Sequence, residues 1–343
     1  SEERKQIIRE KGDELAQSVG GAIVWKDSLL DEVSGLVEYP VPVLGTFEES
    51  FLEVPREVLL ISMQSHQKSF GVENSDSTLK NHFLSTLNLE PTDESLVTKG
   101  WERVLRARLE DARFFWKTDL AVEAATWVDE LDKVIFLGPL GSMGDKSRRL
   151  QKLCAWLSDK LEPALKDDAV RAASLAKADL VSEMVGEFSD LQGIMGGIFA
   201  SKWGENETVS KAIYEQYLPA GQDSPVPDSL AGCILSLADK ADTLVGCFGL
   251  KKIPTGANDP YALRRGVLGI CRIILEKKLR LNISEFLAET LAVYGDIQWK
   301  LDKGDILAKL NEFIAGRLKS YFVAKGFSTL AVEAAIGAGI DDV

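Results

Sequence analysis

Histidine is almost absent from this chain: its 343 residues include only His66 and His82. The imidazoles of a His-rich metal centre are therefore missing, and no Ser/His/Asp set, Walker loop or GxGxxG motif occurs. Cysteine is also scarce. The four cysteines are far apart, with no CxxC pair, and each lies among apolar residues: Cys154, Cys233, Cys247 and Cys271. This pattern disfavours a zinc site and predicts reduced, buried thiols in a cytoplasmic protein.

Long apolar runs are missing too. No stretch approaches 18 consecutive apolar residues, so no membrane-spanning helix is expected. The first ten residues are charged and helix-forming, unlike a signal peptide. Residue 1 is Ser rather than Met, and we expect the chain to be a piece of a longer protein. With 53 acidic and 40 basic side chains, the net charge is −13, which argues against attraction of nucleic acid to the whole surface.

Apolar periodicity predicts an α+β, predominantly helical protein in three parts. Residues 1–125 form a mixed α+β domain, residues 126–295 an all-α domain, and residues 296–343 a helical tail. A helix over Leu29–Val37 is expected to stop at Pro40 and Pro42. The predicted strands are Ala22–Trp25, Lys68–Val72 and His82–Leu87. The helices predicted in the all-α domain and the tail are Lys146–Leu165, Asp168–Phe188, Thr208–Tyr217, Ser229–Gly246, Pro260–Lys278, Ile283–Tyr294 and Ile306–Lys325.

Two aspartates, Asp179 and Asp239, interrupt apolar helical patterns about 60 residues apart. Their segments resemble the metal-binding frame of HD-type phosphohydrolases, in which histidines and two such aspartates hold a divalent metal. In that frame the two histidine positions correspond here to Leu137 and Ala178. Two carboxylates without imidazoles hold Mg²⁺ only loosely, through waters. We therefore predict a vestigial frame without metal ligands rather than a hydrolytic site.

If no metal is held, the two aspartates need other partners, because a buried carboxylate is costly when nothing pairs with it. The alternatives are capping of helices by Asp179 and Asp239, or ion pairs with Lys177, Lys146 or Lys240 inside an inherited helical fold.

Charge is unevenly distributed. Residues 251–280 hold eight basic and two acidic side chains, a local charge of +6. The sequence Pro254-Thr255-Gly256-Ala257-Asn258-Asp259-Pro260 favours a turn, after which Asn258 or Asp259 can cap a helix that begins at Pro260. Such a basic face on an acidic protein can bind a polyanion, and the candidate side chains are Lys251, Lys252, Arg264, Arg265 and Arg272. The alternative is an ordinary capped helix with solvated arginines.

The segment from Arg103 to Trp116 predicts an amphipathic helix in which Arg106 and Glu110 lie four residues apart. Its arginines, Arg106 and Arg108 among them, either make intrahelical ion pairs or present guanidinium groups to phosphates. A second polar segment runs from Gln64 to Phe70 and suits hydrogen bonding to a nucleotide or a peptide backbone.

These motifs together resemble the β subunit of bacterial glycyl-tRNA synthetase, of the α₂β₂ type. The matching stretches follow the family's order along nearly the whole chain: Leu52–Pro55, Gln64–Phe70, Arg106–Phe115, Leu140–Lys146, Glu187-Phe188, Gln192–Gly196, Asp239–Gly246 and Asp259–Arg265. The resemblance implies a central part of that subunit, without its extreme N-terminal portion and its C-terminal anticodon-binding domain.

In that family the α subunit carries the class II active site, which uses ATP and Mg²⁺ to join glycine to tRNA(Gly). The resemblance therefore implies no catalytic residue and no cofactor in this piece, and it implies two partners: the α subunit and the tRNA acceptor arm. It also implies that the HD-like domain is a hydrolase scaffold reused to grip tRNA. Two rivals remain from other classes: a metal-dependent nucleotide phosphohydrolase, and a scaffold that only assembles the α subunit.

Overall fold

The computed structural model describes residues 1–337 and separates into two compact units. The first unit comprises residues 1–121 and 186–191, and the second comprises residues 122–185 and 192–343. Helices predominate in the described residues, and the only sheet found there has four strands, so the predicted α+β class is confirmed. Residues 338–343, the end of the expected helical tail, lie outside the described residues. No helix within residues 1–337 is long and apolar enough to cross a bilayer.

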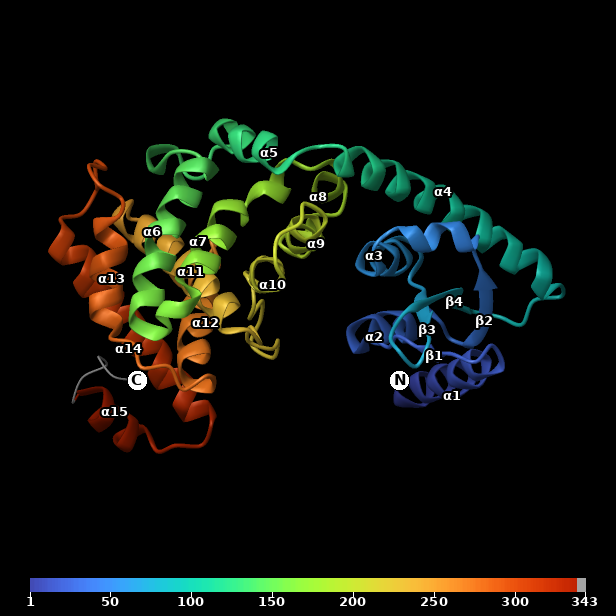
Figure 1. The fold of residues 1–343 in the computed structure, drawn as a ribbon. Coiled ribbons are helices and arrows are strands. Elements are labelled where there is room, and N and C mark those ends of the chain that lie inside the picture. The colour runs from blue at the N-terminus through green and yellow to red at the C-terminus, as the bar shows by residue number, and fades with distance from the viewer. Residues whose placement is uncertain (338–343) are drawn as a thin grey trace. The chain divides into compact units, whose positions relative to one another are not determined.

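The first unit is built on an antiparallel sheet in the order β1-β3-β4-β2 (Figure 1). Its strands are β1 (Ala22–Ile23), β2 (Val41–Thr46), β3 (Phe70–Glu73) and β4 (Leu79–Leu87). The predicted strands correspond to β1, β3 and β4, whereas β2 was not predicted. Pro42 disfavours a strand in the sequence, but β2 pairs only with β4 and lies at the sheet edge, where a residue without an N–H is tolerated.

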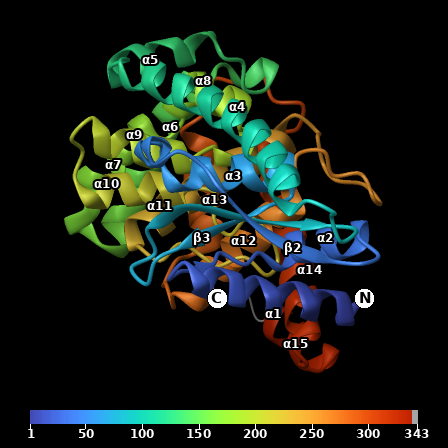
Figure 2. The same ribbon diagram turned by 90° about the vertical axis from the view of Figure 1, so that its right-hand side faces the viewer.

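Helices cover both faces of this sheet, as Figure 2 shows with α1 below and α3 above. The helices of the unit are α1 (Glu2–Ser18), α2 (Asp27–Leu36), α3 (Arg56–Gln67) and α4 (Glu94–Leu120). A Cβ on Gly12 of α1 would meet the side chain of Leu84, whereas a Cβ on Gly71 of β3 would meet Leu60 of α3. Both glycines therefore allow a close approach of helix and sheet. The helix α4 is amphipathic and buries Leu105, Leu109 and Trp116.

The second unit consists of helices around α11 (Leu230–Gly249), which is apolar on nearly all sides. Figure 1 shows α11 among its neighbours, and it contacts α6, α7, α10, α12, α13 and α14. The longer helices around it are α6 (Met143–Leu161), α7 (Lys166–Leu175), α9 (Ile194–Lys202), α10 (Glu207–Glu215), α12 (Leu263–Glu276), α13 (Ile283–Ala292) and α14 (Lys303–Ala324). The remaining helices are α5 (Ala124–Glu130), α15 (Thr329–Gly337) and α8 (Glu183–Glu187), whose last two residues are counted in the first unit. All four cysteines are buried in this core as free thiols, as predicted.

Three predicted helices of this unit differ from the structure. The helix expected over Lys146–Leu165 ends at Leu161, because Glu162 is extended before Pro163. The single helix expected over Asp168–Phe188 is instead α7, a 3₁₀ turn over Ala178–Val181, and α8. The break lets the Asp179 carboxylate reach backbone N–H groups at the start of α9. The helix expected from Pro260 begins at Leu263, because Ala262 adopts a left-handed conformation with φ 53°.

Candidate functional site

The two aspartates of the HD-like frame lie in a buried network of charged side chains. Helix α6 opens with a capping box between Ser142 and Asp145, which orients Lys146 and Arg149 towards α11. Both basic residues are buried, with exposed fractions of 3% and 6%. Because residues three apart share one face of a helix, they meet the matching pair on α11, Asp239 and Asp242.

The distances in this network are short. Lys146 Nζ lies 3.1 Å from Asp239 Oδ1 and 3.1 Å from Asp242 Oδ2. Arg149 donates from Nε and Nη2 to the two carboxylate oxygens of Asp242, at 2.6 and 3.2 Å. This bidentate geometry satisfies a carboxylate that is fully buried. Tyr294 adds a hydrogen bond from its hydroxyl to the Asp242 carbonyl oxygen at 2.6 Å.

A second lysine reaches Asp239 from the turn after α7. Lys177 Nζ lies 2.9 Å from Asp239 Oδ1 and donates to Gln216 Oε1 and the Tyr217 hydroxyl at 2.8 and 2.9 Å. Burial opposes ionisation of the Asp239 carboxyl group, but Lys146 and Lys177 outweigh it and hold its pKa well below the ordinary range. Asp239 therefore stays ionised between two ammonium groups.

Asp179 is held by backbone rather than by lysine. Its Oδ2 accepts hydrogen bonds from the N–H groups of Gly193 and Gly196, at 2.6 and 3.0 Å, at the start of α9. Its Oδ1 is buried and has no hydrogen-bond partner within the described residues. Burial raises the pKa of Asp179 to about 6, even though the Gly193 N–H and the Lys177 charge favour the ionised form.

These residues do not fit a divalent metal. Leu137 is half-buried against the helical core and Ala178 is buried, so neither frame position offers a ligand. No group of three or more His, Cys, Asp or Glu side chains in residues 1–337 could hold a metal ion. Asp239 Oδ1 lies within 3.1 Å of two ammonium groups, and a divalent cation beside them would meet strong repulsion.

The basic segment forms an ordered turn before α12. Asp259 accepts from the backbone N–H groups of Leu263 and Arg264, at 2.9 and 3.0 Å, so its carboxylate holds the start of the helix. Arg264 donates from Nη2 to the Gly256 carbonyl oxygen at 2.7 Å, whereas Arg265 is exposed. The turn thus holds the Arg264 guanidinium group by a hydrogen bond and leaves the Arg265 side chain exposed.

Three more of the candidate cations belong to this segment, in different settings. Lys251 is exposed, and Lys252 donates to the Tyr261 hydroxyl at 2.8 Å while remaining exposed. Arg272 was expected on the exposed basic face, but it is buried, with an exposed fraction of 8%. Its Nε donates to Glu276, and its Nη1 donates to the carbonyl oxygens of Gly221, Gln222 and Ser224. Arg272 therefore holds a loop in place. The remaining candidates are the exposed Lys251, Lys252 and Arg265 and the half-buried Arg264.

The remaining candidates lie on α4 of the first unit. Arg106 makes ion pairs with Glu48 and Glu110, at 2.9 and 3.1 Å, while Arg108 is exposed. The Glu110 interaction predicted from the four-residue spacing is confirmed, and it raises the pKa of Arg106, as does Glu48. Arg106 is thus partly neutralised by carboxylates, whereas no ion pair involves Arg108 in the described part of the chain.

A family model for the glycyl-tRNA synthetase beta subunit matches residues 1–337. The chain belongs to the glycyl-tRNA synthetase beta subunit family. It is 62% identical over 342 residues to the glycine–tRNA ligase beta subunit of Nitratidesulfovibrio vulgaris strain DP4. The match covers 100% of this chain and 49% of that protein. The same subunit of Lawsonia intracellularis is 50% identical over 333 residues, covering 97% of this chain and 48% of that protein. The chain spans about half the length of these curated relatives.

For this member of the beta subunit family, part of the buried network was not predicted from the sequence. Lys146, Lys177 and Lys240 were expected as possible partners of the aspartates. Lys240 instead donates to the Leu218 carbonyl oxygen and to Ser236. The contributions of Arg149, Asp242 and Tyr294 were not expected. One signal was present in the sequence: Asp239 and Asp242 lie three residues apart in a helix that is otherwise apolar, as do Lys146 and Arg149 in α6. Two such pairs are compatible with mutual neutralisation inside a core.

Proposed function

We propose that this chain is the part of a glycine–tRNA ligase β subunit that binds the acceptor arm of tRNA(Gly), while the α subunit joins glycine to the tRNA. The observation that carries this proposal is the 62% identity to glycine–tRNA ligase beta subunits along the whole chain. The proposal includes an α subunit as partner, ATP and Mg²⁺ bound there, and a cytoplasmic location. The chain itself then contributes binding rather than bond-making chemistry.

The buried network supports a binding role over hydrolysis. A phosphohydrolase needs a metal to generate a nucleophilic water and to stabilise the developing charge. Asp239 instead pairs with Lys146 and Lys177, and Asp179 accepts hydrogen bonds from backbone N–H groups at the start of α9. The HD-like frame therefore stabilises the helical unit, and the tRNA contacts belong to its exposed cations.

The basic segment with the exposed Lys251, Lys252 and Arg265 and the half-buried Arg264 is the first candidate for those contacts. Phosphate oxygens are bound by lysine, arginine and backbone N–H groups, and a rigid turn loses little entropy when it binds. Arg106 and Arg108 form a second candidate surface on the first unit. It is the weaker one, because Glu48 and Glu110 already engage Arg106.

Binding of tRNA(Gly) to this chain alone, measured across a salt series, tests the proposal. We expect affinity to fall steeply as salt rises, because each phosphate contact releases counterions. Binding of the α subunit without tRNA binding at low salt would favour the scaffold alternative. Phosphate release from nucleotides in the presence of Mn²⁺ would favour a hydrolase.

A further inference from the structure

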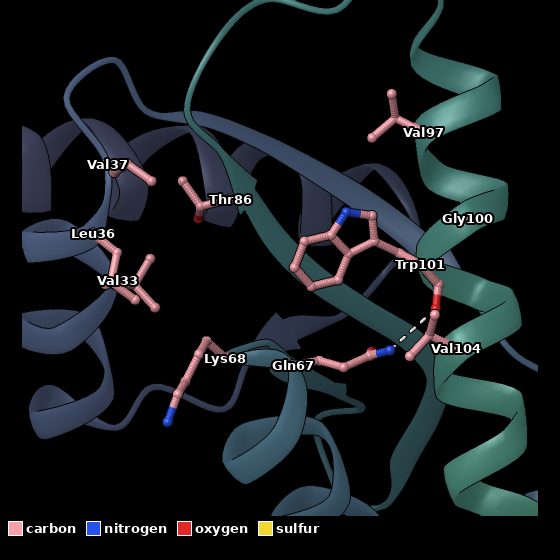
Figure 3. Close-up of a pocket in the computed structure, with 10 residues that line it drawn as sticks. All are labelled: Val33, Leu36, Val37, Gln67, Lys68, Thr86, Val97, Gly100, Trp101 and Val104. Carbon is pink, nitrogen blue, oxygen red and sulfur yellow. Dashed lines mark hydrogen bonds between the residues drawn. The ribbon is translucent and has the colours of Figure 1, made fainter.

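Two pockets of this chain differ in their charge. In the first unit, a cavity of about 570 Å³ lies between α2, β4 and α4, with the Trp101 indole between α4 and the apolar side chains of α2 (Figure 3). One cation lines it, Lys68, and that side chain pairs with Glu32 at 2.9 Å. In the second unit, a pocket of about 300 Å³ lies between the end of α11 and α14, and two cations line it, Lys309 and Arg317. The second pocket therefore combines apolar walls with positive charge.

The apolar wall of this second pocket follows from how α11 ends. Lys251 adopts a left-handed conformation with φ 57°, at a position that glycine usually takes after a helix. The chain turns there, and Ile253 lines the pocket together with Phe248 of α11 and Phe313 of α14. The two ring centroids are 5.3 Å apart, and Phe248 is buried whereas Phe313 is half-buried. Phe313 therefore offers ring surface to a ligand, and Phe248 supports it from the core.

The two cations of the pocket keep their charge available. Lys309 is exposed and Arg317 is half-buried, and neither takes part in an ion pair within the described residues. The Arg317 guanidinium carbon lies 5.7 Å from the Phe313 ring centroid, which places a positive charge beside the aromatic wall. Glu312 is the acidic residue among those that line the pocket. With two basic side chains and one acidic, the lining favours an anionic group, in a chain whose net charge is −13.

A glycine leaves room in this pocket. Gly316 lies well inside α14, where glycine destabilises a helix relative to alanine. A Cβ built on Gly316 would meet nothing from another part of the fold within 4 Å, so close packing does not require a glycine here. Gly316 does line the pocket, on the same face of α14 as Lys309 and Phe313. A longer side chain at this position would take up space that a ligand could use.

We propose that this pocket binds a nucleotide, an unpaired one of the bound tRNA. The proposal rests on the proposed function and adds a site to it: the base lies against the Phe313 ring, and Lys309 and Arg317 hold its phosphate. Stacking on an aromatic side chain, with basic groups along the backbone, is the usual means of binding single-stranded RNA. Lys252 directly precedes Ile253 of the pocket wall, so the pocket adjoins the basic segment.

A variant that fills the pocket without removing charge tests this proposal. Gly316→Leu should weaken binding of tRNA(Gly) to this chain by about fivefold to a hundredfold, the range for loss of one stacked base. Because leucine favours a helix more than glycine does, the thermal midpoint should stay equal to or rise above that of the wild type, which separates blocked binding from unfolding. Ala308→Leu is the matched control, because Ala308 is exposed on α14 outside the pocket, and it should bind like the wild type.

A second variant tests the phosphate contact. Lys309→Ala should lower the steepness of log K against log salt by about 0.7, the value for one phosphate of a single strand. Lys303→Ala is its control, because Lys303 is an exposed cation at the start of α14 that does not line the pocket. The control should leave the salt slope of the wild type unchanged.

The outcomes separate the pocket from the proposed function. If the wild type binds tRNA(Gly) and Gly316→Leu binds it equally well, the pocket proposal is wrong while the proposed function stands. Weaker binding of the α subunit by Gly316→Leu, with tRNA binding unchanged, would assign the pocket to a protein partner and equally overturn it.

If the wild type does not bind tRNA(Gly), the proposed function fails, and titration with AMP decides about the pocket. Saturable AMP binding that Gly316→Leu abolishes would support the nucleotide assignment, with a free nucleotide as the source. Absence of AMP binding in that case, or AMP binding that Gly316→Leu leaves unchanged, would overturn the assignment.

Discussion

Lys177 Nζ lies 2.9 Å from Asp239 Oδ1, and this ion pair joins the turn after α7 to the central helix α11. The same oxygen is 3.1 Å from Lys146 Nζ of α6. One carboxylate oxygen therefore lies between two ammonium groups, and the second carboxylate of the network, that of Asp242, also pairs with Lys146.

Metal removal should leave the protein's stability unchanged. Because no metal-ligand cluster is present in residues 1–337, we expect EDTA to leave the thermal midpoint where it was. Differential scanning fluorimetry of matched samples checks this expectation. A lower midpoint after chelation that returns with Mn²⁺ or Zn²⁺ would show that the aspartates bind a metal.

Replacing Asp239 should destabilise the helical unit. Asp239→Ala leaves Lys146 and Lys177 buried without their common carboxylate, and removal of one partner of a buried charge pair typically costs about 3–5 kcal/mol. Urea unfolding measures the change in the free energy of unfolding.

Asp228→Ala is the control for that change, because it breaks the exposed ion pair between Asp228 and Lys211 and should have little effect. If Asp239→Ala were as stable as the wild type and abolished a measurable turnover, the aspartate would be catalytic.

Asp179 should give the protein an unusual pH dependence. Its folded-state pKa is raised to about 6, above the ordinary value of 3.8, so between these values only the folded state retains the proton. The contribution of Asp179 to the free energy of unfolding must then fall as pH rises from about 4 to about 6. Asp179→Asn keeps an acceptor for Gly193 and Gly196 but removes the titration. Relative to the wild type, it should gain about 1–3 kcal/mol between pH 4.5 and pH 7.5.

Urea midpoints of both proteins at the two pH values check this prediction. Asp239 and Asp145 have lowered pKa values, about 2 for Asp145, so their contributions change below this window. Asp179→Ala is the second comparison: it leaves two backbone N–H groups without an acceptor and should be destabilising at both pH values. Parallel wild-type and Asp179→Asn curves would mean that Asp179 does not titrate there.

The sequence predicts those parts of this fold that depend on local pattern. The apolar helical pattern of α11 and the strand-forming segment His82–Leu87 of β4 give correct elements, because both depend on local sequence. The strand β2 was missed because Pro42 disfavours a strand everywhere except at a sheet edge, and edge position is a tertiary property. The break after Leu175 was missed for a similar reason: the Asp179 hydrogen bonds that accompany it reach 14 and 17 residues along the chain.

For the candidate site, too, the sequence predicts what depends on local pattern and misses what depends on tertiary packing. The cost of burying Asp179 and Asp239 is evident from their apolar surroundings, and it predicts that partners exist. The partners themselves depend on packing: Arg149 and Asp242 are 93 residues apart, and nothing in their spacing brings them together. Arg272 was included in the basic surface because net charge in a sequence window does not distinguish a solvated arginine from one that binds carbonyl oxygens.

The double change Arg264→Ala/Arg265→Ala tests the proposed tRNA surface. Removing one phosphate-binding side chain should lower the steepness of log K against log salt by about 0.7–0.9, so affinity for tRNA(Gly) should fall and its salt dependence should flatten. Glycine activation by an assembled α₂β₂ enzyme should stay nearly intact, because the two arginines act on tRNA alone. Lys152→Ala/Lys202→Ala removes the same charge from exposed positions on α6 and α9 and serves as the control. If both double variants kept the wild-type slope and aminoacylation rate, the turn before α12 would be ordinary solvated surface. Arg106 and Arg108 on α4 would then be the next residues to replace.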